Sequence, residues 1–192
     1  MSQSGPPRSP PGQEKPQPQD SAAVYSRLQQ ALALHQRGQL DRAELIYREI
    51  LTHAPDYIDA LKLLGMLEGQ KGNAAGAMEW LSQAIRINPY DASAHSNIGV
   101  ALLELKRSEA ALTNFDRALA LKPDLAVALN GRGIALLELK RPEAALASFD
   151  RALALKPDFA IALNGRGNAL LQLKRPEEAL ASYNHALKHQ PD

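Results

Sequence analysis

Two sets of residues in this sequence have types and spacings that could carry chemistry. His185 and His189 are four residues apart, so on a helix both imidazoles could face one metal ion. The tripeptide Gly-Arg-Gly, at 131–133 and again at 165–167, is glycine-rich in the manner of a phosphate-binding loop. No third metal ligand is close to the histidines, and both tripeptides fall inside predicted helices. We therefore predict polar, solvent-facing positions for the histidines and helix packing for the tripeptides.

The amino-acid composition excludes several kinds of catalytic and binding site. The absence of cysteine excludes disulfides, thiolate catalysis and cysteine-ligated zinc. The 22 basic and 21 acidic residues give a net charge of +1, which provides no electrostatic basis for binding nucleic acid or an anionic membrane. No P-loop or nucleophile-elbow motif occurs. We predict a protein that is not an enzyme, with no catalytic residue, no cofactor and no metal.

The first 20 residues differ from the rest and predict a separate segment. They hold six of the 13 prolines and no aromatic residue, so residues 1–20 are predicted to be a disordered, proline-rich tail before an array at 21–192. The tail carries a PxxP pattern at residues 7–10, but a solvated tail is the simpler interpretation. The start lacks the apolar stretch of a secretory signal, and no run approaches the roughly 20 apolar residues of a membrane helix. We expect a cytoplasmic protein.

The elements that must position these residues recur every 34 residues. Prolines mark the period at Pro55, Pro89, Pro123, Pro157 and Pro191. Alanines lie twelve residues earlier, at Ala43, Ala77, Ala111, Ala145 and Ala179. Large side chains lie eight residues earlier, at Tyr47, Leu81, Phe115, Phe149 and Tyr183. Glycines lie 24 residues before the last four prolines, at Gly65, Gly99, Gly133 and Gly167.

This pattern resembles the tetratricopeptide repeat (TPR) family. The resemblance covers repeats at 24–57, 58–91, 92–125, 126–159 and 160–192, and it implies an all-α, right-handed solenoid of five helix–turn–helix hairpins. The repeat sequences are similar to those of bacterial arrays found in O-GlcNAc-transferase-like proteins. The small residues should lie at helix crossings and the aromatic residues between neighbouring repeats. These structural positions are Gly65, Gly99, Gly133, Gly167, Ala77, Ala111, Ala145, Ala179, Phe115, Phe149 and Tyr183.

Local signals place the helices within each repeat. In repeat four we predict helices at about 126–139 and 142–155. Pro142 suits the first turn of its helix, where no internal donor is lost. Asn73 and Ser108 are predicted to cap the corresponding helices of earlier repeats. His95 replaces a large apolar residue, so we expect a packed, hydrogen-bonded histidine.

The resemblance implies a concave groove lined by the first helix of each repeat. Its predicted residues are Lys62, Met66, Asn97, Val100, Val127, Asn130, Ile134, Ile161, Asn164 and Asn168. Gly131 and Gly165 are expected to leave room at the groove wall. Arg132 and Arg166 are expected to pair with acids such as Asp116 and Asp150, with ligand binding as the alternative.

The groove residues do not match one binding mode known in the family, the recognition of a terminal carboxylate. Chaperone-binding members of the family hold a terminal carboxylate in a clamp of Lys, Arg and Asn. Lys62 and Asn97 match two clamp positions. Met66 replaces an expected asparagine, and Val127 and Gly131 replace expected basic residues. We therefore do not expect recognition of a carboxyl-terminal acidic motif.

The leading hypothesis is a non-catalytic scaffold that binds a peptide or protein segment in the concave groove. One alternative is the amino-terminal array of a larger glycosyltransferase similar to O-GlcNAc transferase, whose catalytic residues would lie in other sequence. Another is a structural solenoid that self-associates through uncapped ends, where Leu180, Tyr183 and Leu187 would be partly bare. The sequence leaves open whether the chain is a piece of a longer protein.

Overall fold

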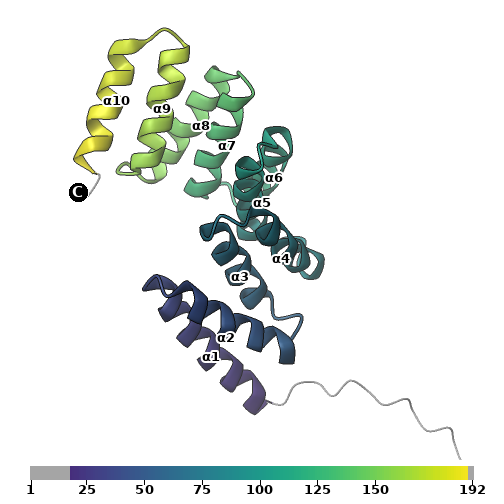
Figure 1. The fold of residues 1–192 in the computed structure, drawn as a ribbon. Coiled ribbons are helices and arrows are strands. Elements are labelled where there is room, and N and C mark those ends of the chain that lie inside the picture. Colours follow the sequence, from purple (N-terminus) through teal and green to yellow (C-terminus); the bar gives the residue numbers. More distant parts are fainter. Residues whose placement is uncertain (1–17, 190–192) are drawn as a thin grey trace, which may run out of the picture.

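The computed structural model describes residues 18–189, which fold into ten α-helices and no strand (Figure 1). The helices form five antiparallel hairpins, as the all-α solenoid prediction requires. Their bounds are α1 (Pro18–Gln36), α2 (Leu40–His53), α3 (Ile58–Gln70), α4 (Ala74–Ile87), α5 (Ala92–Glu104), α6 (Ser108–Leu121), α7 (Ala126–Glu138), α8 (Pro142–Leu155), α9 (Ala160–Gln172) and α10 (Pro176–Lys188).

The predicted helix limits agree closely with those observed. In repeat four, α7 ends one residue before the predicted limit and α8 matches it at both ends. At the other end of the chain, α1 begins at Pro18, within the segment predicted to be a tail. The remainder of that tail, with its PxxP pattern at residues 7–10, lies outside the described residues.

The packing order of the helices produces a curved array. Each helix packs against the next along the chain, and each odd-numbered helix also contacts the odd-numbered helix of the following repeat. Among the described helices, the even-numbered ones make no comparable contact with one another. Figure 1 shows the resulting arc, running in sequence order from α1 to α10. The first helices therefore line the inner face, and the second helices form the outer one.

Helix starts follow the predicted chemistry in most repeats. Pro142 and Pro176 occupy the first turns of α8 and α10. Asn73 caps α4, with its Oδ1 accepting a hydrogen bond from the Gly76 N–H at 3.0 Å. The prediction for Ser108 is wrong, because it is the first helical residue of α6 and its hydroxyl donates to Glu138 instead.

The turns inside the hairpins need a left-handed residue. Gly38 and Gly72 supply it in the first two repeats, with φ of 73° and 78°. Lysines take the same place in the other three repeats, at Lys106, Lys140 and Lys174, with φ between 58° and 59°. A residue with a Cβ is disfavoured in this conformation, so these three turns hold some strain that the packed hairpins offset.

The core consists of three clusters of buried residues along the array, and Leu112 and Leu119 pack against both the second and the third. The period's alanines are fully or almost fully buried, and Phe115 and Phe149 are completely buried. Tyr183 is half-buried on α10. Because small residues stand where helices cross, the backbones approach closely and the inner row of helices is held in register.

Candidate functional site

The inner face carries an exposed apolar row. Met66, Val100, Val127 and Ile161 lie on α3, α5, α7 and α9 and are 40%, 38%, 50% and 61% exposed. All four were predicted to line the groove. Met66 and Val100 occupy the ninth position of their repeats, whereas Val127 and Ile161 occupy the second, so the apolar row consists of two pairs on successive first helices. Since exposed apolar side chains gathered on one face indicate an interaction site, these four residues are the strongest candidate for a contact surface.

The other predicted groove residues are less accessible. Lys62, Asn97, Ile134 and Asn164 are half-buried, and Ile134 packs against the core around Phe149. Asn168 is exposed, and its Oδ1 accepts a hydrogen bond of 2.7 Å from the Tyr183 hydroxyl.

Asn130 differs from the expectation, because it is only 7% exposed. Its position in the repeat faces the neighbouring first helix, and α5, α7 and α9 pack closely enough to cover it. Within the described residues its Oδ1 has no hydrogen-bond partner, and neither has Oγ of Ser96, which occupies the same repeat position on α5. Asn130 is therefore an interhelical residue and not an open part of the groove.

Lys62 is neutralised by its neighbours. Its Nζ lies 2.7 Å from Oδ2 of Asp91 and 3.9 Å from Oδ1 of Asp59. Burial opposes ionisation of Asp91, but hydrogen bonds from Lys62, Ser93 and the Ala94 N–H outweigh it and lower the pKa of Asp91 to about 2. An ammonium group already held in this way is a poor anchor for a ligand carboxylate.

A hollow of about 230 Å³ opens beside the apolar row, between α3 and α5. It is lined by Met66, Val100 and the glycines Gly65 and Gly69, and by Ala77 and Leu81 of α4. An added Cβ at Gly69 would meet only the Ala77 Cβ, at 3.9 Å, so this glycine leaves real space. The hollow was not predicted from the sequence, although Gly69 stands where later repeats have Leu103, Leu137 and Leu171.

The Gly-Arg-Gly tripeptides prove to be packing elements. A Cβ at Gly131 would lie 2.3 Å from Cζ of Phe115, and one at Gly133 would lie 2.6 Å from Cζ of Phe149. Gly165 likewise faces the Phe149 ring. The prediction that Gly131 and Gly165 leave room at the groove wall is therefore wrong, because the aromatic ring of the preceding repeat occupies that space.

The arginines between these glycines tie neighbouring repeats together. Arg132 Nε donates to Asp116 at 2.7 Å, and its Nη1 donates to the Ser148 hydroxyl at 2.8 Å. Arg166 repeats the arrangement one unit later, with Asp150 at 2.7 Å and Ser182 at 2.6 Å. The predicted acidic partners are confirmed, and Nε and Nη1 of both arginines already donate to protein groups, which argues against the ligand-binding alternative.

No metal centre is evident in the part of the chain described. The rings of His185 and His189 have centroids 5.0 Å apart, so the two side chains do lie together. Among residues 18–189, however, no three histidine or acidic side chains are grouped so that they could hold an ion. None of the helices in that range is long and apolar enough to cross a bilayer.

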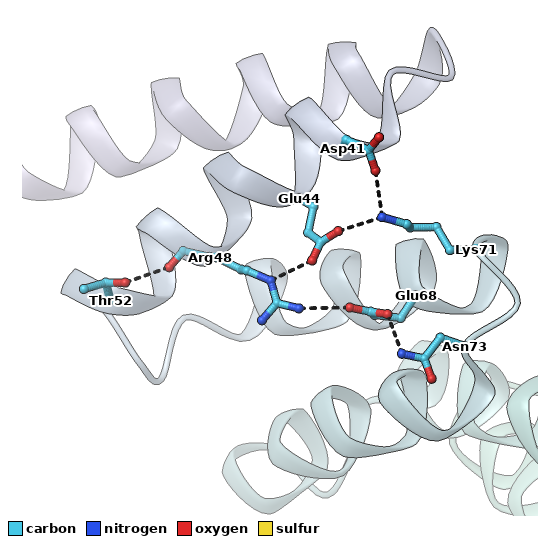
Figure 2. A network of polar contacts seen from close by, with 7 residues as sticks. All are labelled: Asp41, Glu44, Arg48, Thr52, Glu68, Lys71 and Asn73. Carbon is cyan, nitrogen blue, oxygen red and sulfur yellow. Dashed lines mark hydrogen bonds and ion pairs between the residues drawn. The ribbon is translucent and has the colours of Figure 1, made fainter.

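The junction between the first two repeats contains a polar network that was not predicted from the sequence. Figure 2 shows Arg48 between Glu44 and Glu68, with Nε–Oε1 2.7 Å and Nη2–Oε1 3.1 Å. Lys71 Nζ lies 2.7 Å from Asp41 and 2.9 Å from Glu44. The signal was Glu68, which is buried at the place of Leu102, Leu136 and Leu170 in later repeats.

The comparison with protein families agrees with this architecture. Two tetratricopeptide repeat models match residues 130–192 and 90–158, and a TPR repeat model matches residues 65–106. The chain belongs to the tetratricopeptide repeat family. Together the matches span residues 65–192, the part of the TPR array in which the glycine and aromatic markers are most regular.

Solved structures show the same fold. The thermophilic TPR protein TTC0263 of Thermus thermophilus is 23% identical, with a TM-score of 0.76 over 88% of this chain and 92% of its own. PilF of Pseudomonas aeruginosa is 22% identical, with a TM-score of 0.79 over 90% of this chain and 78% of its own. YrrB, described as a TPR protein with an unusual peptide-binding site, is 22% identical, with a TM-score of 0.65 over 90% of this chain and 92% of its own. At these identities the likeness establishes the TPR solenoid fold.

Proposed function

We propose that this array is a non-catalytic interaction scaffold that holds a segment of another polypeptide along its inner face. The observation that carries the proposal is the row of Met66, Val100, Val127 and Ile161, exposed on four successive first helices. Apolar side chains of a partner would be stabilised by burying their surface against each of these four residues. The repeat fold supports the proposal, since TPR solenoids present such a face, and YrrB, with the same fold, is described by its peptide-binding site.

The charges on the inner face indicate which kind of polypeptide segment it could bind. Lys62 is engaged by Asp91 and Asp59, and the two other clamp positions at which a basic residue is expected hold Val127 and Gly131. Contacts along the row would therefore be mainly apolar, with the amides of Asn97, Asn164 and Asn168 available to the bound backbone. A segment held internally fits this surface better than a free carboxyl terminus does.

The direct test is to make the row polar. The double variant Met66→Glu/Ile161→Glu places two carboxylates at exposed positions, so the fold should persist while partner binding falls by at least about tenfold. The matched control is Leu45→Glu/Leu155→Glu, which makes the same change at exposed positions on the second helices. Affinity capture from lysate, followed by binding measurements with the captured partner, compares the three proteins. Equal partner binding by both double variants and the wild type would refute the groove.

Two other ideas from the sequence remain predictions. The family matches are to the repeat itself and do not extend the similarity to O-GlcNAc-transferase-like arrays. In α10, Leu180 and Leu187 are exposed and Tyr183 is half-buried, and these are the residues that self-association through an uncapped end would use. Sedimentation velocity at several concentrations tests it, and a monomer throughout would exclude it. The cytoplasmic and bacterial assignments stay as predicted from sequence.

A further inference from the structure

The hollow between α3 and α5 has a composition unlike the rest of the inner face. Its apolar lining includes Met66, Val100 and Leu81, together with the bare backbone of Gly69. Its polar lining side chains are Asn97, Gln70 and Glu104, of which Gln70 and Glu104 are exposed to solvent, and these three are called the rim. Such a pocket suits a side chain that is apolar along its length and polar at its tip.

The rim presents acceptors and, in Glu104, a full negative charge. Glu104 is exposed, and among the described residues no lysine, arginine or histidine pairs with it, whereas other carboxylates of the array do have such partners. Gln70 Oε1 already lies 2.9 Å from Nε2 of His35, which fixes that side chain at the rim. A cation entering the hollow would meet an available carboxylate beside two amide groups.

The next repeat shows why this arrangement occurs only once along the row. Leu103 stands one period after Gly69, and Glu138 stands one period after Glu104. Glu138 is paired with Lys106 Nζ at 3.4 Å and also accepts from the Ser108 hydroxyl. The equivalent space there is filled and the equivalent charge is satisfied, so Glu138 provides a natural internal control.

We propose that the hollow binds one arginine side chain of the polypeptide segment held along the inner face. The methylenes would lie between Met66 and Val100, and the guanidinium would reach the Glu104 carboxylate. The planar guanidinium of arginine can donate two parallel hydrogen bonds to one carboxylate and still has N–H donors for the neighbouring amides. A lysine ammonium cannot form this bidentate pair, so it fits the site less well. The inference rests on the proposed function, since it names the anchor of a segment that the apolar row holds.

The test uses the intact 192-residue chain and a phage library of random 12-residue peptides. Wild type should enrich peptides that combine apolar residues with one arginine at a fixed spacing. Synthetic copies are then measured with arginine, lysine, norleucine or glutamate at that place. We expect affinity to fall in that order. Glu104→Gln should weaken the arginine peptide roughly 5- to 20-fold, while the norleucine peptide changes less than twofold.

Two further variants locate the effect. Gly69→Leu fills the hollow with the residue that three other repeats carry, and it should weaken the arginine and norleucine peptides alike. Glu138→Gln should leave all four peptides unchanged. Thermal unfolding of each variant establishes that it is folded, and Glu104→Gln, an isosteric change at an exposed site, keeps the test valid if Gly69→Leu disturbs the helix pair.

The outcomes separate this inference from the proposed function. If the enriched peptides lose binding with Met66→Glu/Ile161→Glu but do not distinguish arginine from norleucine, the anchor is refuted and the groove stands. An equal loss from Glu104→Gln and Glu138→Gln refutes it too, because a general negative field would explain the preference. Peptides that bind the groove variant as well as the wild type, or a library with no enrichment over bare resin, refute both proposals.

Discussion

Glycines on the first helices have two different roles, which their surroundings distinguish. Gly131 lies against the ring of Phe115, where an added Cβ would come within 2.3 Å of Cζ. Gly69 faces open space, with its nearest prospective contact at 3.9 Å. One glycine is therefore required by packing between repeats, and the other shapes the inner surface.

This difference predicts opposite responses to the same substitution. Gly131→Ala should lower the free energy of unfolding by about 1–3 kcal/mol, because the buried ring must shift to admit a methyl group. Gly69→Ala should leave it unchanged or raise it by up to about 1 kcal/mol, because alanine favours helix and meets no clash. Urea unfolding followed by circular dichroism measures both. Equal destabilisation by the two variants would contradict the assignment of roles.

Single residues were predictable where their partners recur with the repeat. Arg132 was expected to find Asp116, and it does. His95 was expected to be packed and hydrogen-bonded, and it is buried with Nε2 3.0 Å from the Pro89 carbonyl oxygen. Asn130 and Gly131 were misplaced because family positions identify the groove side of a helix but not how closely the next helix covers it. That distance depends on the side chains of both repeats together.

At the scale of the helix, the start of α5 is the most heavily stabilised of the repeat boundaries. Asp91 accepts from the Ala94 N–H at 2.9 Å and from the Ser93 hydroxyl at 2.6 Å, while Lys62 contacts its other oxygen at 2.7 Å. The corresponding residues before α3, α7 and α9 make no side-chain cap. One carboxylate thus caps α5 and also links it to α3.

The lowered pKa of Asp91 predicts acid sensitivity at this boundary. Its ordinary value is 3.8 and its folded value is about 2, so the ionised form is favoured by folding. The stabilisation is present above pH 4 and is lost as the pH falls from about 4 to about 2. In that window wild type should lose about 1–2 kcal/mol more than Asp91→Asn, which retains a cap but cannot titrate. Urea unfolding at a series of pH values measures the difference.

Asp124→Asn is the matched control for this experiment, since Asp124 is an exposed acid in the next loop of the same type. Its pH profile should follow that of the wild type. Parallel profiles for wild type and Asp91→Asn between pH 4 and pH 2 would show that Asp91 does not contribute to the acid transition, whatever the overall acid stability of the protein.

Across the whole molecule, the junctions between repeats are chemically unequal. Repeats three to five are joined by buried aromatic rings against glycines and by the repeated arginine links. The first junction adds the network around Arg48 and Lys71 to an apolar cluster around Tyr47, and the pKa of Lys71 is raised by its hydrogen bonds to Asp41 and Glu44. Periodicity predicted the hairpins and their order, because each repeat must cover its neighbour. It could not predict this junction, which departs from the period.

Because each repeat is stabilised by its neighbours, unequal junctions imply unequal local stability. Exposed ion pairs weaken as salt rises, since the screening length falls from about 10 Å at 0.1 M to about 3 Å at 1 M, whereas apolar contacts do not weaken in this way. Raising NaCl from 0.1 to 1 M should therefore speed amide hydrogen exchange in α2 several-fold relative to α8, as measured by mass spectrometry of peptides from each helix. The double variant Arg48→Gln/Lys71→Gln should exchange quickly in α2 at both salt concentrations. If the wild-type exchange rate in α2 divided by that in α8 does not change with salt, the prediction is contradicted. The buried contacts around Tyr47, and not the ionic network, would then hold the first repeat in place.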